Sequence, residues 1–250
     1  MDKIKLLKNG VSKEKFLRIF QEDYPGFDFE SMFDILKFQG LPLTIIDEKI
    51  FLKTALISFK DTEYVVVDIE VNNSKPQRGQ VIEIGAVKIK NLKITDSFDF
   101  LIYADDVPVF VERVTGISQK MLENEMSQKE ILKKFRLFLG DSVFVAHPAD
   151  FDFNFLVYQF EKENLGKLLN RCVCTLSLSQ KTIKASRYGL KYLMEELDLP
   201  EETHHRALGD ARTTARVFLK CLENLPKEIL SAEDLIEFAK PRKNKNKSKS

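Results

Sequence analysis

Cysteine is scarce in this sequence, and long apolar runs are missing. The three cysteines (Cys172, Cys174 and Cys221) are odd in number and form no Cys-x-x-Cys pair, so buried free thiols are favoured over disulfides or a zinc site. No apolar stretch approaches the roughly 20 residues that span a membrane. Residues 1–10 lack the apolar stretch and cleavage site of a secretory signal. We therefore expect a cytoplasmic protein with no membrane partner.

Neither sign of charge dominates, but the charges are unevenly placed. The 250 residues carry 39 Lys and Arg against 38 Asp and Glu, a formal net charge of +1. Residues 240–250 contain Lys and Arg and no acid, so the preceding chain is acidic. A basic tail on an acidic body suits a tether for nucleic acid beside a metal-loaded site. The alternative is a disordered, solubilising end without a binding role.

Residues 1–60 are predicted to form a small separate unit. We expect helices over 12–20 and 29–38 and a hairpin of 43–46 with 49–52. Ser12 resembles a helix cap, and Pro25-Gly26 ends the first helix. This helix-helix-hairpin order is winged-helix-like, which leaves a contact with nucleic acid or protein open. We slightly prefer the interpretation that this unit only packs against the main domain, because its helices lack the stripe of basic residues that binds nucleic acid.

The remaining chain predicts an α/β domain over 63–224, followed by a short helix and the basic tail in 225–250. Expected strands are 64–70, 81–89, 95–103, 142–146 and 171–176, and expected helices include 152–163, 190–197, 207–222 and 231–240. Three sequential strands with short turns indicate an antiparallel meander. Strand–helix alternation follows, so we expect a mixed five-stranded sheet flanked by helices.

Acidic residues follow the first strand of this domain. The run Tyr64-Val65-Val66-Val67 reads as a buried strand, and side chains two apart in a strand point the same way. Asp68 and Glu70 therefore face one side, where a divalent cation would relieve their repulsion. The alternative is a strand that simply exits into solvent.

Two further acids and a histidine occur in separate segments. Asp152 follows the strand 142–146 at the start of a helix, where either Asp150 or Asp152 could be only a cap. Asp210 lies on or beside a face of small residues in the helix 207–222 and is costly there unless paired or metal-bound. His205 precedes that helix; alone, it would read as a surface histidine. Together, four carboxylates and one histidine suit two hard cations and a general base.

These segments resemble motifs of a known family. The motifs are Asp68-Ile69-Glu70 followed by 81–87, then 145–152, then 205–211, with weaker matches at 114–118 and 174–176. They are similar to those of the DnaQ-like DEDDh 3′→5′ exonucleases, which include the epsilon proofreading subunit of bacterial DNA polymerase III. Histidine stands five residues before Asp210 and Arg206 stands four before, which resembles the histidine branch of the family.

The resemblance implies a ribonuclease H-like fold and a set of roles. Asp68, Glu70, Asp152 and Asp210 would bind two Mg²⁺ or Mn²⁺ ions, and His205 would take a proton from the attacking water. The enzyme would release nucleoside 5′-monophosphates from single-stranded DNA 3′ ends. Proofreading would imply the catalytic subunit of DNA polymerase III as partner. His147 resembles a structural histidine of the second motif.

Alternatives remain open at this stage. RNA 3′-end trimming is one, because the sequence does not reveal a pocket for a 2′-hydroxyl. A weakly active polymerase-binding or nucleic-acid-binding module is another. It is motivated by Val71-Asn72-Asn73, where the family usually has Thr-x-Gly after the acids, and by Pro148, where it usually has Asn.

The basic tail generates a first prediction. Truncation after Ala239 should weaken binding to single-stranded DNA and flatten its dependence on salt, because fewer counterions are released. Affinity is to be measured for the full and truncated chains over a series of salt concentrations. Unchanged affinity and unchanged salt slope would identify the tail as a passive end.

Overall fold

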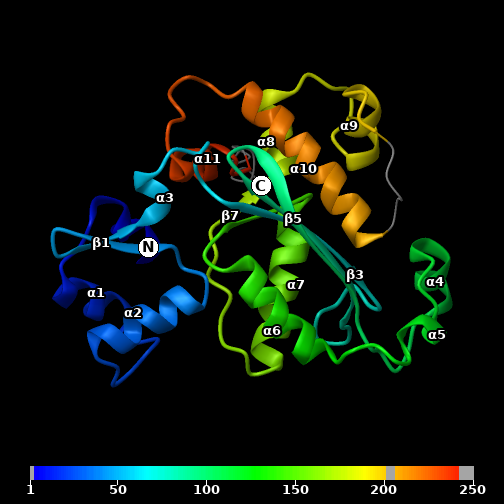
Figure 1. The fold of residues 1–250 in the computed structure, drawn as a ribbon, viewed down its shortest axis with the longest axis horizontal. Helices are drawn as coiled ribbons and strands as arrows, with labels where there is room; N and C mark the ends of the chain where they lie inside the picture. Colours follow the sequence, from blue (N-terminus) through cyan, green and yellow to red (C-terminus); the bar gives the residue numbers. More distant parts are fainter. Residues whose placement is uncertain (1–2, 201–205, 242–250) are drawn as a thin grey trace, which may run out of the picture.

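A mixed five-stranded sheet forms the centre of the main domain (Figure 1). The computed structural model describes residues 3–200 and 206–241. The strands are β3 (Tyr64–Val71), β4 (Val81–Lys90), β5 (Lys93–Leu101), β6 (Val143–Ala146) and β7 (Cys172–Cys174), in the order β5-β4-β3-β6-β7. The first three form the predicted antiparallel meander, and β6 and β7 add in parallel beside β3. The predicted α/β class and mixed sheet are confirmed.

Helices cover both faces of this sheet (Figure 1). One layer contains α6 (Gln128–Leu139) and α7 (Ala149–Lys162); the other contains α8 (Thr175–Thr182), α9 (Leu190–Glu196), α10 (Ala207–Glu223) and α11 (Ala232–Phe238). The central strand β3 is apolar on both sides because it is buried on both sides. Val65 and Val67 pack into the core with α6 and α7, whereas Tyr64 and Val66 pack into the core with α10. The short helices α4 (Val109–Thr115) and α5 (Gln119–Leu122) pack against β4 through a smaller core.

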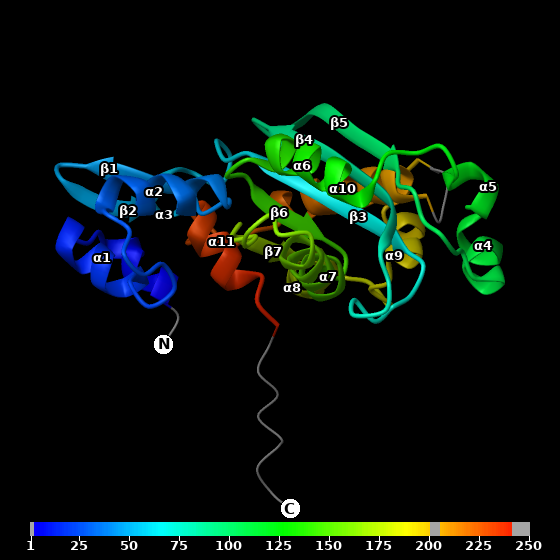
Figure 2. The same cartoon turned by 90° about the horizontal axis from the view of Figure 1, so that it is seen from below.

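Residues 3–56 form the expected helix-helix-hairpin unit, with its own apolar core (Figure 2). Its elements are the 3₁₀ helix η1 (Lys3–Asn9), α1 (Lys13–Phe20), α2 (Phe29–Phe38), β1 (Leu43–Ile46), β2 (Lys49–Leu52) and α3 (Lys53–Leu56). Ser12 caps α1 as predicted, because its side chain accepts the Lys15 amide. Asp47 and Glu48 both have positive φ angles, as a two-residue hairpin turn requires.

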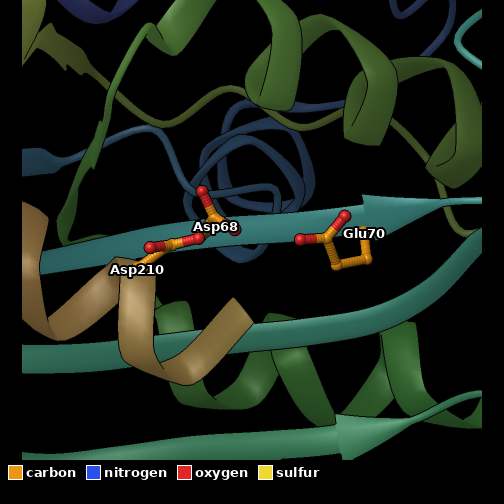
Figure 3. Close-up of side chains that lie close together, drawn as sticks. All are labelled: Asp68, Glu70 and Asp210. Carbon is orange, nitrogen blue, oxygen red and sulfur yellow. The ribbon is translucent and has the colours of Figure 1, made fainter. Parts of the chain in front are cut away.

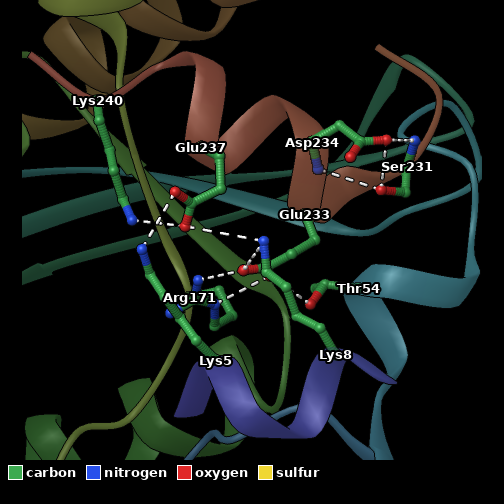
Figure 4. A network of polar contacts seen from close by, with 9 residues as sticks. All are labelled: Lys5, Lys8, Thr54, Arg171, Ser231, Glu233, Asp234, Glu237 and Lys240. Atoms are coloured by element: carbon green, nitrogen blue, oxygen red, sulfur yellow. Dashed lines mark hydrogen bonds and ion pairs between the residues drawn. The ribbon is translucent and has the colours of Figure 1, made fainter. Parts of the chain in front are cut away.

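The N-terminal unit is joined to the main domain by buried charges. Glu233 of α11 has a side chain only 2% exposed, and it pairs with Arg171 and with Lys8 of η1. Its carboxylate also accepts the Thr54 hydroxyl of α3 at 2.9 Å, so one acid joins three segments (Figure 4). On the opposite layer, Arg136 of α6 donates to the carbonyl of Phe38 at the end of α2.

The division at 1–60, 63–224 and 225–250 stays a prediction. The separate core of the N-terminal unit supports its first boundary. Leu235 and Ile236 of α11 lie in the same core as α10, so this helix packs closely against the main domain. Residues 242–250 of the predicted tail lie outside the described residues. Among the residues that are described, no helix is both long and apolar enough to cross a membrane.

Three expected boundaries are wrong. Helix α7 begins at Ala149 rather than Asp152, because Pro148 has an extended backbone and takes the cap position. Strand β7 ends at Cys174, where the chain turns directly into α8, so Thr175 and Leu176 are helical. Strand β5 spans Lys93–Leu101 rather than 95–103, because Asn91 and Leu92, both with positive φ, already form the turn from β4.

Removal of the Glu233 side chain should destabilise the fold strongly. Glu233→Ala leaves the buried Arg171 without its partner, and breaking a buried ion pair costs about 3–5 kcal/mol. Glu237→Ala on the same helix is the matched control; its side chain is 33% exposed, and such a pair contributes about 0–1 kcal/mol. Urea unfolding of both variants tests this. Equal losses of unfolding free energy would contradict it.

Candidate active site

Strand β3 presents two acids to the layer that contains α10. Asp68 and Glu70 continue the alternation of Tyr64 and Val66, so they lie on the same face of the sheet. The register of β4 sets their neighbours: Asp68 is opposite Gly85, and Glu70 is opposite Glu83. Residues directly opposite in a sheet share a face. Asp68 therefore lies beside Gly85, which has no side chain, and Glu70 lies beside a further acid, Glu83.

Gly85 lets α10 approach the sheet closely. A Cβ atom at this position would lie 2.1 Å from the Leu208 nitrogen and 2.2 Å from the Ala207 carbonyl carbon. Both are backbone atoms of the first turn of α10, so no side chain could move aside to make room. The first turn of this helix also contains Asp210. The missing side chain on β4 therefore permits the contact that brings Asp210 to β3.

Asp68, Glu70 and Asp210 meet at this point (Figure 3). One carboxylate oxygen from each lies within 4.8 Å of the others, and all three side chains are partly exposed. Figure 3 shows the Asp210 carboxylate, from α10, directed toward Asp68 on β3. Three of the predicted site residues thus come together from two separate segments.

Electrostatics show how unfavourable this cluster is without a cation. Burial raises the pKa of Asp68 well above its usual range, and the nearby charges of Asp152, Asp210, Glu70 and Glu83 raise it further. Burial also raises the pKa of Glu70 to about 7, with Glu83 and Asp210 adding to the shift and Arg206 opposing it. Each carboxyl resists ionisation because water has been displaced and like charges surround it.

Asp152 lies next to this group. It is 4% exposed in the first turn of α7, and it does not belong to the set of three whose oxygens lie within 4.8 Å. Burial raises its pKa to about 7, the amides of Asp152 and Ile69 lower it, and Glu70 raises it. Pro148 takes the N-cap position of α7, so neither Asp150 nor Asp152 is the N-cap residue itself.

The structure describes only one of the two histidines found in the motifs. His205 lies outside the described residues, directly before Arg206. His147 is held inside the protein, where Nε2 donates to the Tyr188 carbonyl and Nδ1 lies 2.9 Å from the Thr175 hydroxyl. Burial lowers the pKa of His147 to about 4, so it is neutral at pH 7. These contacts agree with the predicted structural role.

Two charged residues at this site were not predicted as site residues. Glu83 is 1% exposed on β4 and pairs with Arg206, whose side chain is 37% exposed. The available signal was Glu83 itself, the one charged residue within the apolar run 81–87. Its partner could not be read from the sequence, because 123 residues separate the two.

The donor set fits hard divalent cations. Every ligand atom in the cluster is a carboxylate oxygen, the type that Mg²⁺, Mn²⁺ and Ca²⁺ prefer. The raised pKa values of Asp68 and Glu70 indicate negative charge that the protein leaves uncompensated. A cation between these carboxylates would remove that repulsion.

A pocket of about 280 Å³ adjoins the acids. Its lining residues are Glu70, Val71, Asn73, Ser74, Phe110, Val111, Val114 and Thr115. Phe110 and Val114 of α4 are largely exposed and form the apolar side of this pocket. The pocket therefore combines an apolar wall with a carboxylate.

The fold and the site define an α/β protein with an acidic centre between its central strand and a covering helix. The Exonuclease family model RNase_T matches residues 65–218, and the chain belongs to that family. The predicted resemblance to DnaQ-like exonucleases is confirmed at this level.

Proteins with a similar sequence include PolC-type DNA polymerase III chains. The chain is 40% identical over 189 residues to a PolC-type DNA polymerase III of Thermotoga maritima, and 32% identical over 215 residues to that of Staphylococcus saprophyticus. These matches cover 72% and 81% of this chain. In both cases the chain spans only 14% of the length of the relative.

Solved structures share the fold. Exonuclease X in complex with 5′ overhanging duplex DNA matches with a TM-score of 0.55 and 20% identity, over 71% of this chain and 99% of that one. Exonuclease I of E. coli in complex with a dA16 oligonucleotide matches with a TM-score of 0.60 and 12% identity, over 71% and 42%. The expected ribonuclease H-like fold is confirmed by this likeness.

The raised pKa values predict how stability depends on pH. Without metal, the folded protein favours protonated Glu70, so the stability linked to this group is full below the ordinary pKa of glutamate and is lost as pH rises from there through about 7. Glu70→Gln should therefore unfold at a higher temperature than the native protein at pH 8 in EDTA, and at a similar temperature at pH 5.

Glu112→Gln, an exposed position on α4, is the control and should leave the pH dependence unchanged. Thermal unfolding at both pH values gives the comparison. A Glu70→Gln variant that is less stable than the native protein at pH 8 would contradict the repulsion argument.

Proposed function

We propose that this protein is a metal-dependent 3′→5′ exonuclease that removes nucleoside 5′-monophosphates from single-stranded DNA 3′ ends. The observation that carries the proposal is the convergence of Asp68, Glu70 and Asp210 at one point of an Exonuclease-family fold. Asp152, buried beside them, is proposed as the fourth ligand. The four carboxylates would hold two Mg²⁺ or Mn²⁺ ions. When bound, such ions lower the pKa of water and stabilise charge on a leaving oxygen.

The chain's own residues would perform the remaining steps. His205, two residues before the start of α10, would accept the proton of the attacking water. The pocket beside Glu70 would receive the terminal nucleoside, with Phe110 and Val114 against the base. Its volume of about 280 Å³ is near the lower end for pockets that take small ligands, about 300 Å³. Holding the terminal unit there would place the adjoining phosphodiester next to the carboxylates.

A role in DNA proofreading is supported by the polymerase relatives. The matched segments belong to PolC-type DNA polymerase III chains, so a replicative polymerase is the proposed partner. The solved neighbours include exonucleases bound to DNA, which supports DNA as the substrate. Another neighbour is a 3′-exonuclease that recognises histone mRNA, so RNA trimming is kept as the second candidate.

Residues 71–73, which differ from the usual family pattern, motivate the alternative of a weakly active binding module. Asn72 has a local role, because its side chain accepts the Gln80 amide and donates to the Asp106 carbonyl, each at 2.9 Å. Val71 and Asn73 line the pocket beside Glu70. These differences from the family pattern therefore lie in the pocket proposed to bind the terminal nucleoside, whereas the carboxylates of the family pattern are retained.

Digestion of labelled oligonucleotides tests the proposal. Matched 5′-labelled single-stranded DNA and RNA are incubated with Mn²⁺ and the native protein, Asp210→Ala, or Asp96→Ala. Asp96 is an exposed aspartate on β5 and serves as the control. Asp210→Ala should reduce hydrolysis by about 10³-fold or more, because a metal ligand is lost, whereas Asp96→Ala should not.

Each outcome leads to a different assignment. A ladder from the 3′ end of DNA that disappears in Asp210→Ala supports the exonuclease. A ladder mainly on RNA moves the assignment to RNA maturation. Full activity of Asp210→Ala would contradict the proposed site. Absence of a ladder with a folded, Mn²⁺-bound native protein would favour the binding module.

A further inference from the structure

Glu83 is a buried acid for which metal binding gives no explanation. Its two oxygens make separate contacts across the sheet-helix boundary. Oε2 accepts the Ala207 amide at 2.9 Å, and Oε1 accepts Arg206 Nε at 2.8 Å and lies 2.6 Å from the terminal nitrogen of the same guanidinium. A carboxylate is costly to bury unless such partners satisfy it. Both of its oxygens are therefore used to hold the beginning of α10.

Helix α10 lacks a cap of its own. Its N-cap residue is Arg206, which makes no side-chain cap hydrogen bond. The first amides of a helix have no partner within the helix and usually bond to a Ser, Thr, Asp or Asn cap. Glu83 supplies this acceptor from the neighbouring strand, and its negative charge suits the positive end of the helix dipole.

This anchor lies at the base of the acidic cluster. The Asp210 amide bonds to the Arg206 carbonyl at 3.1 Å, so Asp210 is one turn from the anchored residue. Two residues along β4, Gly85 contacts the same turn of the helix. Glu83 therefore fixes where α10 starts, and Gly85 permits its close approach.

We propose that Glu83 and Arg206 are positioning residues that set the placement of Asp210 relative to Asp68 and Glu70. The anchoring of α10 stands independently of any activity. Its consequence for catalysis rests on the proposed exonuclease function. The pair contributes no ligand in this proposal; it acts through the geometry of the helix.

Hydrogen exchange of the metal-free full chain tests the anchoring. In Glu83→Ala, the Ala207 amide loses its acceptor and should exchange about tenfold faster or more. Glu63→Ala is the matched control, since Glu63 pairs with Lys90 at the other end of the same two strands, at 2.8 Å. It should leave exchange in α10 unchanged. Equal exchange of the Ala207 amide in the native protein and Glu83→Ala would overturn the proposal.

Conservative variants separate positioning from general destabilisation. Glu83→Gln keeps one acceptor, and Arg206→Lys keeps the charge without the fork of donors. Both should show exchange rates between those of the native protein and Glu83→Ala. If Glu83→Ala does not fold, these two variants decide: native-like exchange in both would overturn the anchoring.

Kinetics and Mn²⁺ titration test the consequence for the site. A small displacement of Asp210 should lower kcat by about 10- to 100-fold. KM for the oligonucleotide should stay within about twofold in Glu83→Ala, because the anchor does not line the nucleoside pocket. Mn²⁺ should bind more weakly, and Glu83→Gln should recover part of both losses. Native kcat and Mn²⁺ affinity in Glu83→Ala would overturn the positioning role. An inactive native protein would instead count against the proposed function, and the exchange result would still stand.

Discussion

The contact between the first turn of α10 and strand β4 is the constraint on which the site depends. It exists because Gly85 has no side chain, and any Cβ there would collide with helix backbone. Because the helix lies this close, Asp210 reaches the two acids of β3. The same closeness removes water from the carboxylates, so their repulsion is strong and their pKa values rise.

The protein tolerates this local repulsion because extensive apolar packing surrounds the strand that carries the acids. Two apolar cores lie on the two faces of β3, and a third holds the N-terminal unit together. Glu233 of α11 joins that unit to the main domain. The N-terminal unit lies at the end of the molecule opposite α4 (Figure 1). The apolar packing on both faces of β3 thus holds the strand in place at the acids. A site with uncompensated charge can then remain open to a cation and a substrate.

The departures from prediction have local physical causes. Pattern reasoning located the strands of the meander and helices α1, α2 and α10 because their periodicities are strong and their ends carry turn residues. It placed the start of α7 three residues late, since Asp150 and Asp152 resemble caps and the extended Pro148 was overlooked. It extended β7 too far, because Thr175 and Leu176 have side chains that suit a strand as well as a helix.

The sequence by itself determined that Asp68 and Glu70 share one face of their strand. Alternation along a strand is a local rule, so Asp68 and Glu70 could be assigned to one side without a structure. Only the tertiary structure decided how α10 reaches them. The pairing of Glu83 with Arg206 joins residues 123 positions apart, and the need for glycine at Gly85 arises from a helix that is distant in sequence. Such contacts depend on how elements pack, and no short-range pattern encodes them.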